Sequence, residues 1–135
     1  MHRLFAVLTL ACAIGLPAAA QPAPEPDWTA AQTIEIDLSN FAFNPASLTL
    51  KQGVAYRLHF VNRASGGHDY SAKDFFAAAT IDPEDQPAVT GGKVTLKGNQ
   101  SGDVRLIATQ TGHFDVICTH LMHATMGMRG EVVVQ

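Results

Sequence analysis

The end of the chain concentrates side chains that bind soft metal ions. The stretch CTHLMHATMGMRGEVVV runs from Cys118 to Val134, and its first eleven positions hold one cysteine, two histidines and three methionines. Thiolate, imidazole and thioether are the donors that favour copper. Methionine also fills hydrophobic cores and histidine is common on surfaces. The rest of the sequence therefore has to distinguish a metal site from ordinary packing.

The spacing within this stretch suits one metal ion. His123 follows Cys118 by five positions, and Met128 follows His123 by five. A loop of this size between two strands can bring three side chains to one point. A trigonal copper site uses one thiolate, two imidazoles and a weak axial thioether, so one imidazole must come from elsewhere. His68 is the best candidate, because it lies in a glycine-rich loop where Gly67 lets the backbone approach a metal closely.

The surrounding sequence predicts the short strands that would hold these residues. Ile34, Ile36 and Leu38 alternate with polar residues, and segment 54–61 alternates in the same way, as in strands with one buried face. Further strands are expected at 93–98, 103–109, 112–118 and 130–135. Their regular spacing predicts an all-β fold, an antiparallel β-sandwich of seven or eight strands. Segment 73–81 is expected to form one short helical insert, and His59 to be a solvated surface residue.

The order of these residues resembles that of the cupredoxins, the type 1 copper proteins that include plastocyanin, azurin, pseudoazurin and the auracyanins. The resemblance rests on the spacing Cys118-x4-His123-x4-Met128-x-Gly130, on an upstream GGHD, and on FAFNPASLTLKQGVAYRLHFVN, which looks like the family's early strands. It implies a Greek-key β-sandwich that holds one Cu(I)/Cu(II) ion per chain at one end. The ligands that it implies are His68, Cys118, His123 and Met128.

The chain departs from the family pattern beside the first ligand. Many relatives have asparagine after the upstream histidine, where its amide ties the two ligand loops together, whereas this chain has Asp69. A carboxylate can accept the same hydrogen bonds, and its negative charge is expected to favour Cu(II) and to lower the reduction potential. Gly67 is a candidate for a second axial contact through its backbone carbonyl.

The ligand loop also carries more donors than one site needs. Leu121 and Met122 stand where many relatives have Pro-Gly before the second ligand histidine. Met126 competes with Met128 as axial ligand, and Met128 is favoured because GM-x-G before the last strand matches the family. Otherwise Met122 and Met126 are expected to serve in packing. His120 is expected to point away from the cysteine side toward solvent, while remaining a candidate secondary ligand or partner contact.

Other kinds of chemistry fit the sequence poorly. The chain has 135 residues, enough for one domain, and a formal net charge of −3, without the basic patch that binds nucleic acid. A thiol hydrolase needs an oxyanion hole and a substrate cleft, a structural zinc site needs four Cys or His ligands, and an iron–sulfur cluster needs more thiolates. The sequence therefore predicts a copper-binding protein that is not an enzyme.

The first twenty residues have the features of a secretory signal peptide. Arg3 precedes an apolar run over 4–16, and small residues lead up to a cleavage site after Ala20. The run is shorter than the ~20 residues that span a bilayer. The predicted organisation is a signal peptide at 1–20, a Pro/Ala-rich linker at 21–31 and a copper-binding domain at 32–135, in a monomeric periplasmic protein that is not integral to the membrane. Lipidation of Cys12 is the alternative.

Single-electron transport between redox partner proteins is the function that these features predict. The edge of His123 would meet the partner inside an apolar rim of Leu121, Met122 and Ala124. A second hypothesis is copper sequestration or delivery with copper-trafficking partners, because surplus soft donors could pass Cu(I) along. A third, a metal-free interaction module, predicts that Cys118→Ser has no effect.

Overall fold

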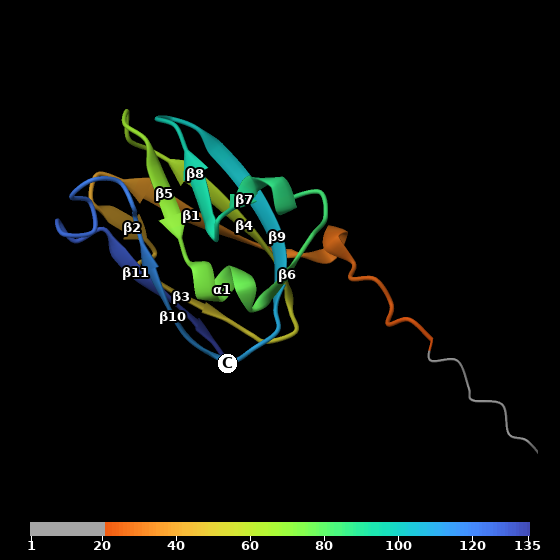
Figure 1. Ribbon diagram of the computed structural model, residues 1–135. Helices are drawn as coiled ribbons and strands as arrows, with labels where there is room; N and C mark the ends of the chain where they lie inside the picture. Colours follow the sequence, from red (N-terminus) through yellow and green to blue (C-terminus); the bar gives the residue numbers. More distant parts are fainter. Residues whose placement is uncertain (1–20) are drawn as a thin grey trace, which may run out of the picture.

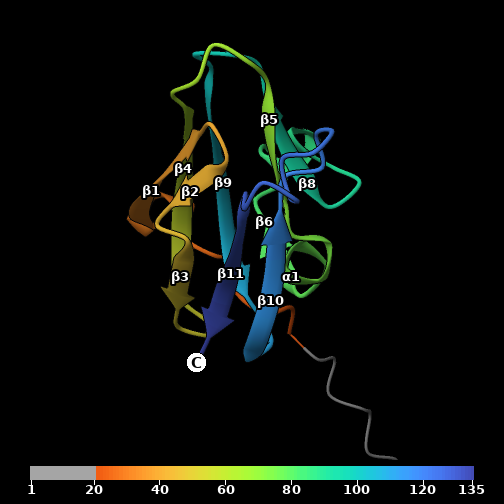
Figure 2. The same cartoon turned by 90° about the vertical axis from the view of Figure 1, so that its left-hand side faces the viewer.

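The computed structural model describes residues 21–135, which form two β-sheets packed face to face. In spatial order, the first sheet contains β2 (Ala42–Asn44), β1 (Gln32–Ser39), β4 (Ala55–Asn62), β9 (Ser101–Ala108) and β6 (Ala79–Ile81). The second contains β3 (Ser47–Leu50), β11 (Arg129–Val134), β10 (Gly112–Ile117), β5 (His68–Ser71), β8 (Lys93–Leu96) and β7 (Val89–Thr90). Figure 1 views the sandwich from one side, and Figure 2 shows the two layers nearly edge-on. The predicted signal peptide lies outside the described residues.

Alternating apolar side chains fill the space between the sheets. In β4, Tyr56, Leu58 and Phe60 are buried, and the side chains between them are more exposed. Strands of both sheets add inward-facing residues in the same way, including Ile36, Leu38, Val104, Leu106, Leu48, Leu50, Val116 and Val132. Burial of this apolar surface is the main driving force for the fold.

The helical content is small. The insert α1 (Lys73–Ala77) is anchored by the buried rings of Phe75 and Phe76, and two short 3₁₀ helices lie at Trp28–Ala30 and Gln86–Ala88. The prediction of a helix to residue 81 was too long. Ala79–Ile81 is strand β6, which pairs with β9, because its β-branched Thr80 and Ile81 favour an extended backbone. No helix in the described part of the chain has the length and apolarity to cross a membrane.

The predicted all-β sandwich with one short helical insert is confirmed. It differs from the prediction in having more strands and in combining parallel with antiparallel strand pairings. Residues 21–135 form eleven strands rather than seven or eight. Two of the pairings are parallel, β1 with β4 and β3 with β11. Alternation in a sequence marks which face of a strand is buried, but it does not indicate the direction of the neighbouring strand.

The sheet topology brings three distant segments to one edge. Strand β10 runs antiparallel to β5 and β11, with Ile117 opposite both Ser71 and Arg129. The end of β10 therefore lies between the end of β5 and the start of β11, and the residues that follow Ile117 run back along β5 toward His68. Loop 118–128 lies beside the start of β5 there, at the end opposite the C-terminus (Figures 1 and 2).

Candidate metal centre

Three of the predicted ligands converge at this edge. The Nδ1 atoms of His68 and His123 are 3.2 Å apart. The Sγ atom of Cys118 lies 3.9 Å from Nδ1 of His68 and 3.4 Å from Nδ1 of His123. A point equidistant from these three atoms lies about 2.0 Å from each, which is the usual length of a metal–imidazole bond (~2.0–2.1 Å). The donor triangle of His68, Cys118 and His123 thus has the dimensions of a metal site.

Burial changes the pKa values of two of these donors. Cys118 and His68 are almost completely inaccessible to water, and His123 is partly exposed. Burial lowers the pKa of His68, and repulsion from His123 and His120 lowers it further, so the neutral ring with a free lone pair is favoured. Burial raises the pKa of the Cys118 thiol, so a metal must displace its proton on binding. Nε2 of His68 is buried without a hydrogen-bond partner in the described chain, and packing holds this ring in place.

The ligand loop is held by its own backbone. The Cys118 N–H donates to the Met128 carbonyl over 3.2 Å, and the Met128 N–H donates to the His123 carbonyl over 2.9 Å. These bonds tie the cysteine, the second histidine and the methionine to one another. Met128 is fully buried, whereas Met126 is 58% exposed. Burial therefore favours Met128 over Met126 as the thioether near the triangle.

Asp69 joins the two ligand segments as predicted for a carboxylate. Its Oδ1 accepts a hydrogen bond from the Thr119 N–H over 2.8 Å, and its Oδ2 accepts one from the Thr119 hydroxyl over 2.6 Å. The Lys93 ammonium lies 3.8 Å from Oδ2 and donates to the Thr119 hydroxyl over 3.0 Å. The carboxylate is buried, and the Thr119 N–H, the Thr119 hydroxyl and the Lys93 ammonium surround it beside His68.

Asn62, which was not among the residues predicted for the site, fixes the loop before His68. The Nδ2 atom of Asn62 lies 2.8 Å from the Gly66 carbonyl and 3.0 Å from the Lys97 carbonyl. Its Oδ1 accepts a hydrogen bond from the Ala64 N–H over 3.0 Å. The amide thus fastens loop 63–67 to the turn after β8. The available signal was its position at a strand end before a glycine-rich segment, where such side chains often bond to the local backbone.

His120 lies closer to the site than predicted. Its ring stacks on that of His123, with centroids 5.5 Å apart and an interplanar angle of 22°. The reason is a turn in which the His123 N–H donates to the His120 carbonyl over 3.1 Å. A Cβ atom on Gly67 would come within 3.2 Å of His120 Cε1. Gly67 therefore makes room for this ring. The expectation that the backbone carbonyl of Gly67 makes a second axial contact to the metal stays a prediction.

Three further expectations need correction. Met122 and Met126 were expected to pack, but they are 57% and 58% exposed, because the turns at 121–127 lie outside both sheets. His59 was expected to be solvated, but its Nδ1 lies 2.6 Å from Asp103 Oδ1. His68 was placed in a loop, but it begins strand β5.

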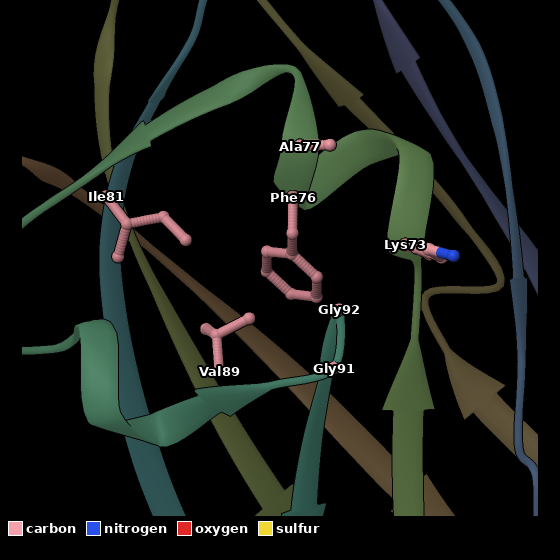
Figure 3. A pocket seen from close by; sticks show the side chains of 7 residues that line it. All are labelled: Lys73, Phe76, Ala77, Ile81, Val89, Gly91 and Gly92. Carbon is pink, nitrogen blue, oxygen red and sulfur yellow. The ribbon is translucent and has the colours of Figure 1, made fainter.

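An apolar pocket of about 470 Å³ lies away from the donor triangle. Figure 3 shows Phe76 of α1, Ile81 and Val89 pointing into it. Lys73, Ala77, Gly91 and Gly92 complete its lining. None of the predicted ligands lines this pocket.

Two imidazoles and a cysteine sulfur that converge at the end of a two-sheet β-sandwich are the donors of a small copper-binding protein. The sequence matches the family described as copper binding proteins, plastocyanin/azurin family, over residues 30–135. The chain belongs to this family, and copper is its cofactor. The resemblance to the cupredoxins is confirmed.

Solved structures share the fold. A dithionite-reduced auracyanin from the photosynthetic bacterium Roseiflexus castenholzii is 23% identical, with a TM-score of 0.57, over 78% of this chain and 98% of the auracyanin. Auracyanin B is 25% identical, with a TM-score of 0.56, over 78% of this chain and 89% of its own. The McoA multicopper oxidase of Aquifex aeolicus is 12% identical, with a TM-score of 0.62, over 85% of this chain but 32% of the oxidase. No curated protein sequence matches significantly.

Proposed function

We propose that the chain is a single-electron carrier whose copper is bound by His68, Cys118 and His123, with Met128 as the axial ligand. The observation that carries the proposal is the donor triangle, whose three atoms are already spaced for one metal ion. Copper, when bound, supplies a one-electron Cu(I)/Cu(II) couple. The protein supplies an arrangement of donors in which Cys118 and His68 are shielded from water and His123 is partly exposed.

The surroundings of the triangle support electron transfer because they restrict movement. A backbone hydrogen bond joins Cys118 to Met128, and hydrogen bonds from Thr119 to Asp69 join the segment of Cys118 to that of His68. Donors held in this way need to move little when the charge of the site changes. Little movement favours rapid electron exchange, whereas a flexible site has to rearrange at each transfer.

A redox partner would approach at His123, the partly exposed member of the triangle. Phe41 packs against its ring edge-on, with centroids 5.2 Å apart. Leu121 is 88% exposed and Met122 is also exposed on the same loop. With Ala124, they form an apolar rim of the kind that binds partner proteins.

The location and domain organisation are part of the proposal. We infer export to the periplasm through the signal peptide at 1–20, with 21–31 as a linker before a monomeric domain at 32–135. Fractionation of cells and N-terminal sequencing of the exported protein test this. An N-terminus at Gln21 is expected, and a lipidated N-terminus at Cys12 would replace the soluble carrier with an anchored one.

The decisive experiment is a spectrum of the copper-loaded protein. The chain is expressed from Gln21, loaded with Cu(II), and examined by visible absorption and electron paramagnetic resonance. Intense thiolate-to-copper absorption with a small copper hyperfine splitting is expected, and Cys118→Ser should abolish it. A pale solution with a large hyperfine splitting in the unaltered protein would reject the electron-carrier function.

Copper sequestration or delivery is the second candidate, favoured by the exposed thioethers of Met122 and Met126. The two functions differ in how readily the metal leaves. Excess Cu(I) chelator, added to the reduced loaded protein, should remove copper slowly from an electron carrier. Copper delivery would be favoured instead if the chelator removed all of the copper faster than the loaded protein exchanges an electron with a small-molecule oxidant.

A further inference from the structure

Three donor side chains of the ligand loop are left unused by the buried site. They are the imidazole of His120 and the thioethers of Met122 and Met126. With Leu121, the two methionines are the large hydrophobic residues that are exposed in the described part of the chain. Large apolar side chains gathered on one exposed loop mark a binding surface. The chemistry of this loop shows what it is suited to bind.

The backbone brings the two methionines together. The Met126 N–H donates to the Met122 carbonyl over 2.9 Å. This hydrogen bond closes a turn that carries both methionine side chains on one exposed segment. Met122 has a left-handed backbone, with φ of 67°, where a side chain other than glycine costs about 1 kcal/mol. The local backbone therefore does not explain why methionine stands at this position.

His120 precedes the two methionines on the same loop, and its Nε2 atom lies within ion-pair distance of the Asp69 carboxylate. Neither ring nitrogen makes a hydrogen bond to another residue within 21–135, and Nε2 is 3.7 Å from Asp69 Oδ2, too far for a hydrogen bond. The side chain is 38% exposed. Its ring stacks on the ring of His123 and occupies the space that the missing side chain of Gly67 leaves open. It therefore offers a positioned imidazole at the surface of the loop.

We propose that His120, Met122 and Met126 form a second, surface site for Cu(I). Two thioethers and one imidazole select a soft monovalent ion over Cu(II) and over hard divalent cations. Methionine has three rotatable side-chain bonds, so its sulfur atoms can reach an ion beside the fixed imidazole. The stacking of His120 on His123 places this site next to the buried one. The proposal concerns metal binding alone and holds for either function above.

The experiment counts Cu(I) ions on the metal-free protein expressed from Gln21. Cu(I) is titrated without oxygen against a chromophoric Cu(I) chelator, and Ag(I) with mass spectrometry serves as a redox-inert probe. The unaltered protein is expected to bind about two ions, in keeping with two soft donor sets. The double variant Met122→Leu/Met126→Leu keeps the apolar surface and should bind one ion while retaining the thiolate-to-copper absorption. Cys118→Ser should also bind one.

The control is His113→Asn, because His113 is an exposed histidine outside the loop. It should leave the count at two. The proposal is overturned if the unaltered protein binds one ion, or if the double leucine variant still binds two; the surface would then be an apolar contact only. The proposed electron-transfer function is tested separately by the Cu(II) spectrum. If that function is wrong, the thiolate-to-copper absorption will be absent, whatever the Cu(I) count.

Discussion

Asp69 places a negative charge in the hydrogen-bond network that joins the two ligand segments. Asp69→Asn keeps an oxygen for the Thr119 N–H and removes the charge that favours Cu(II), so the reduction potential should rise. A charge of this kind contributes about 1–2 kcal/mol at an effective dielectric constant near 20, or roughly 40–90 mV for one electron. Protein-film voltammetry measures the change.

Lys93 provides the matched control for that prediction. Its ammonium lies 3.8 Å from Asp69 Oδ2 and offsets part of the negative charge. Lys93→Met should therefore shift the potential in the opposite direction, downward. An unchanged or lower potential in Asp69→Asn would contradict the electrostatic role of the carboxylate.

The buried ligands make the metal-free protein sensitive to pH in both directions. The pKa of His68 lies below its ordinary value of 6.5, mainly because of burial. The unfolded chain therefore binds a proton that the folded chain does not, and stability should fall as the pH drops below about 6.5. The pKa of Cys118 lies above its ordinary value of 9.0 because of burial. The unfolded chain then loses a proton first, so stability should also fall above about pH 9.

Chemical denaturation of the metal-free protein across this pH range checks both signs. One proton contributes up to about 1.4 kcal/mol per pH unit. His68→Gln should reduce the acid slope and leave the alkaline slope, and Cys118→Ser should do the reverse. Equal slopes in all three proteins would show that other groups control the pH dependence.

At the scale of elements, the junction between β4 and β5 depends on Asn62. Asn62→Ala would leave the carbonyls of Gly66 and Lys97 without this donor, and unsatisfied buried polar groups cost about 1–3 kcal/mol each. A loss of about 2–3 kcal/mol in the free energy of unfolding is expected, with weaker thiolate-to-copper absorption because His68 follows this loop. Urea denaturation and the visible spectrum measure the two effects.

Gln52→Ala is the control for this junction. Gln52 also donates from a side-chain amide, to the Thr109 carbonyl over 2.7 Å, but it is exposed to water. Its removal should cost less than about 0.5 kcal/mol and leave the spectrum unchanged. Equal losses in the two variants would mean that loop 63–67 is not held by Asn62.

The elements also show what the sequence could predict. The spacing of Cys118 and His123 within one loop predicted two corners of the donor triangle, and alternation in segment 54–61 predicted the buried face of β4. The parts that were missed depend on contacts between distant segments. Asn62 reaches the turn after β8, Lys93 reaches Thr119 across the pairing of β5 with β8, and β1 pairs in parallel with β4. Local periodicity carries no information on such contacts.

For the molecule as a whole, the fold and the metal are separable. The core is built from apolar residues of both sheets, and of the proposed ligands it includes Cys118 and Met128 as well-packed members. Small zinc domains fold only with their metal because they lack such a core. This sandwich has a core of its own, and its donor triangle is anchored to strands within it.

The metal-free protein is therefore expected to stay folded, with a β-sheet circular dichroism spectrum and one cooperative thermal transition. Copper at about 1,000 times its dissociation constant should add about 4 kcal/mol and raise the midpoint by roughly 10–20 °C. Cys118→Ser should unfold near the metal-free midpoint and gain much less from copper, since the dominant donor is gone. A metal-free protein without a cooperative transition would mean that copper, rather than the packing of β5, β10 and β11, brings His68, Cys118 and His123 together.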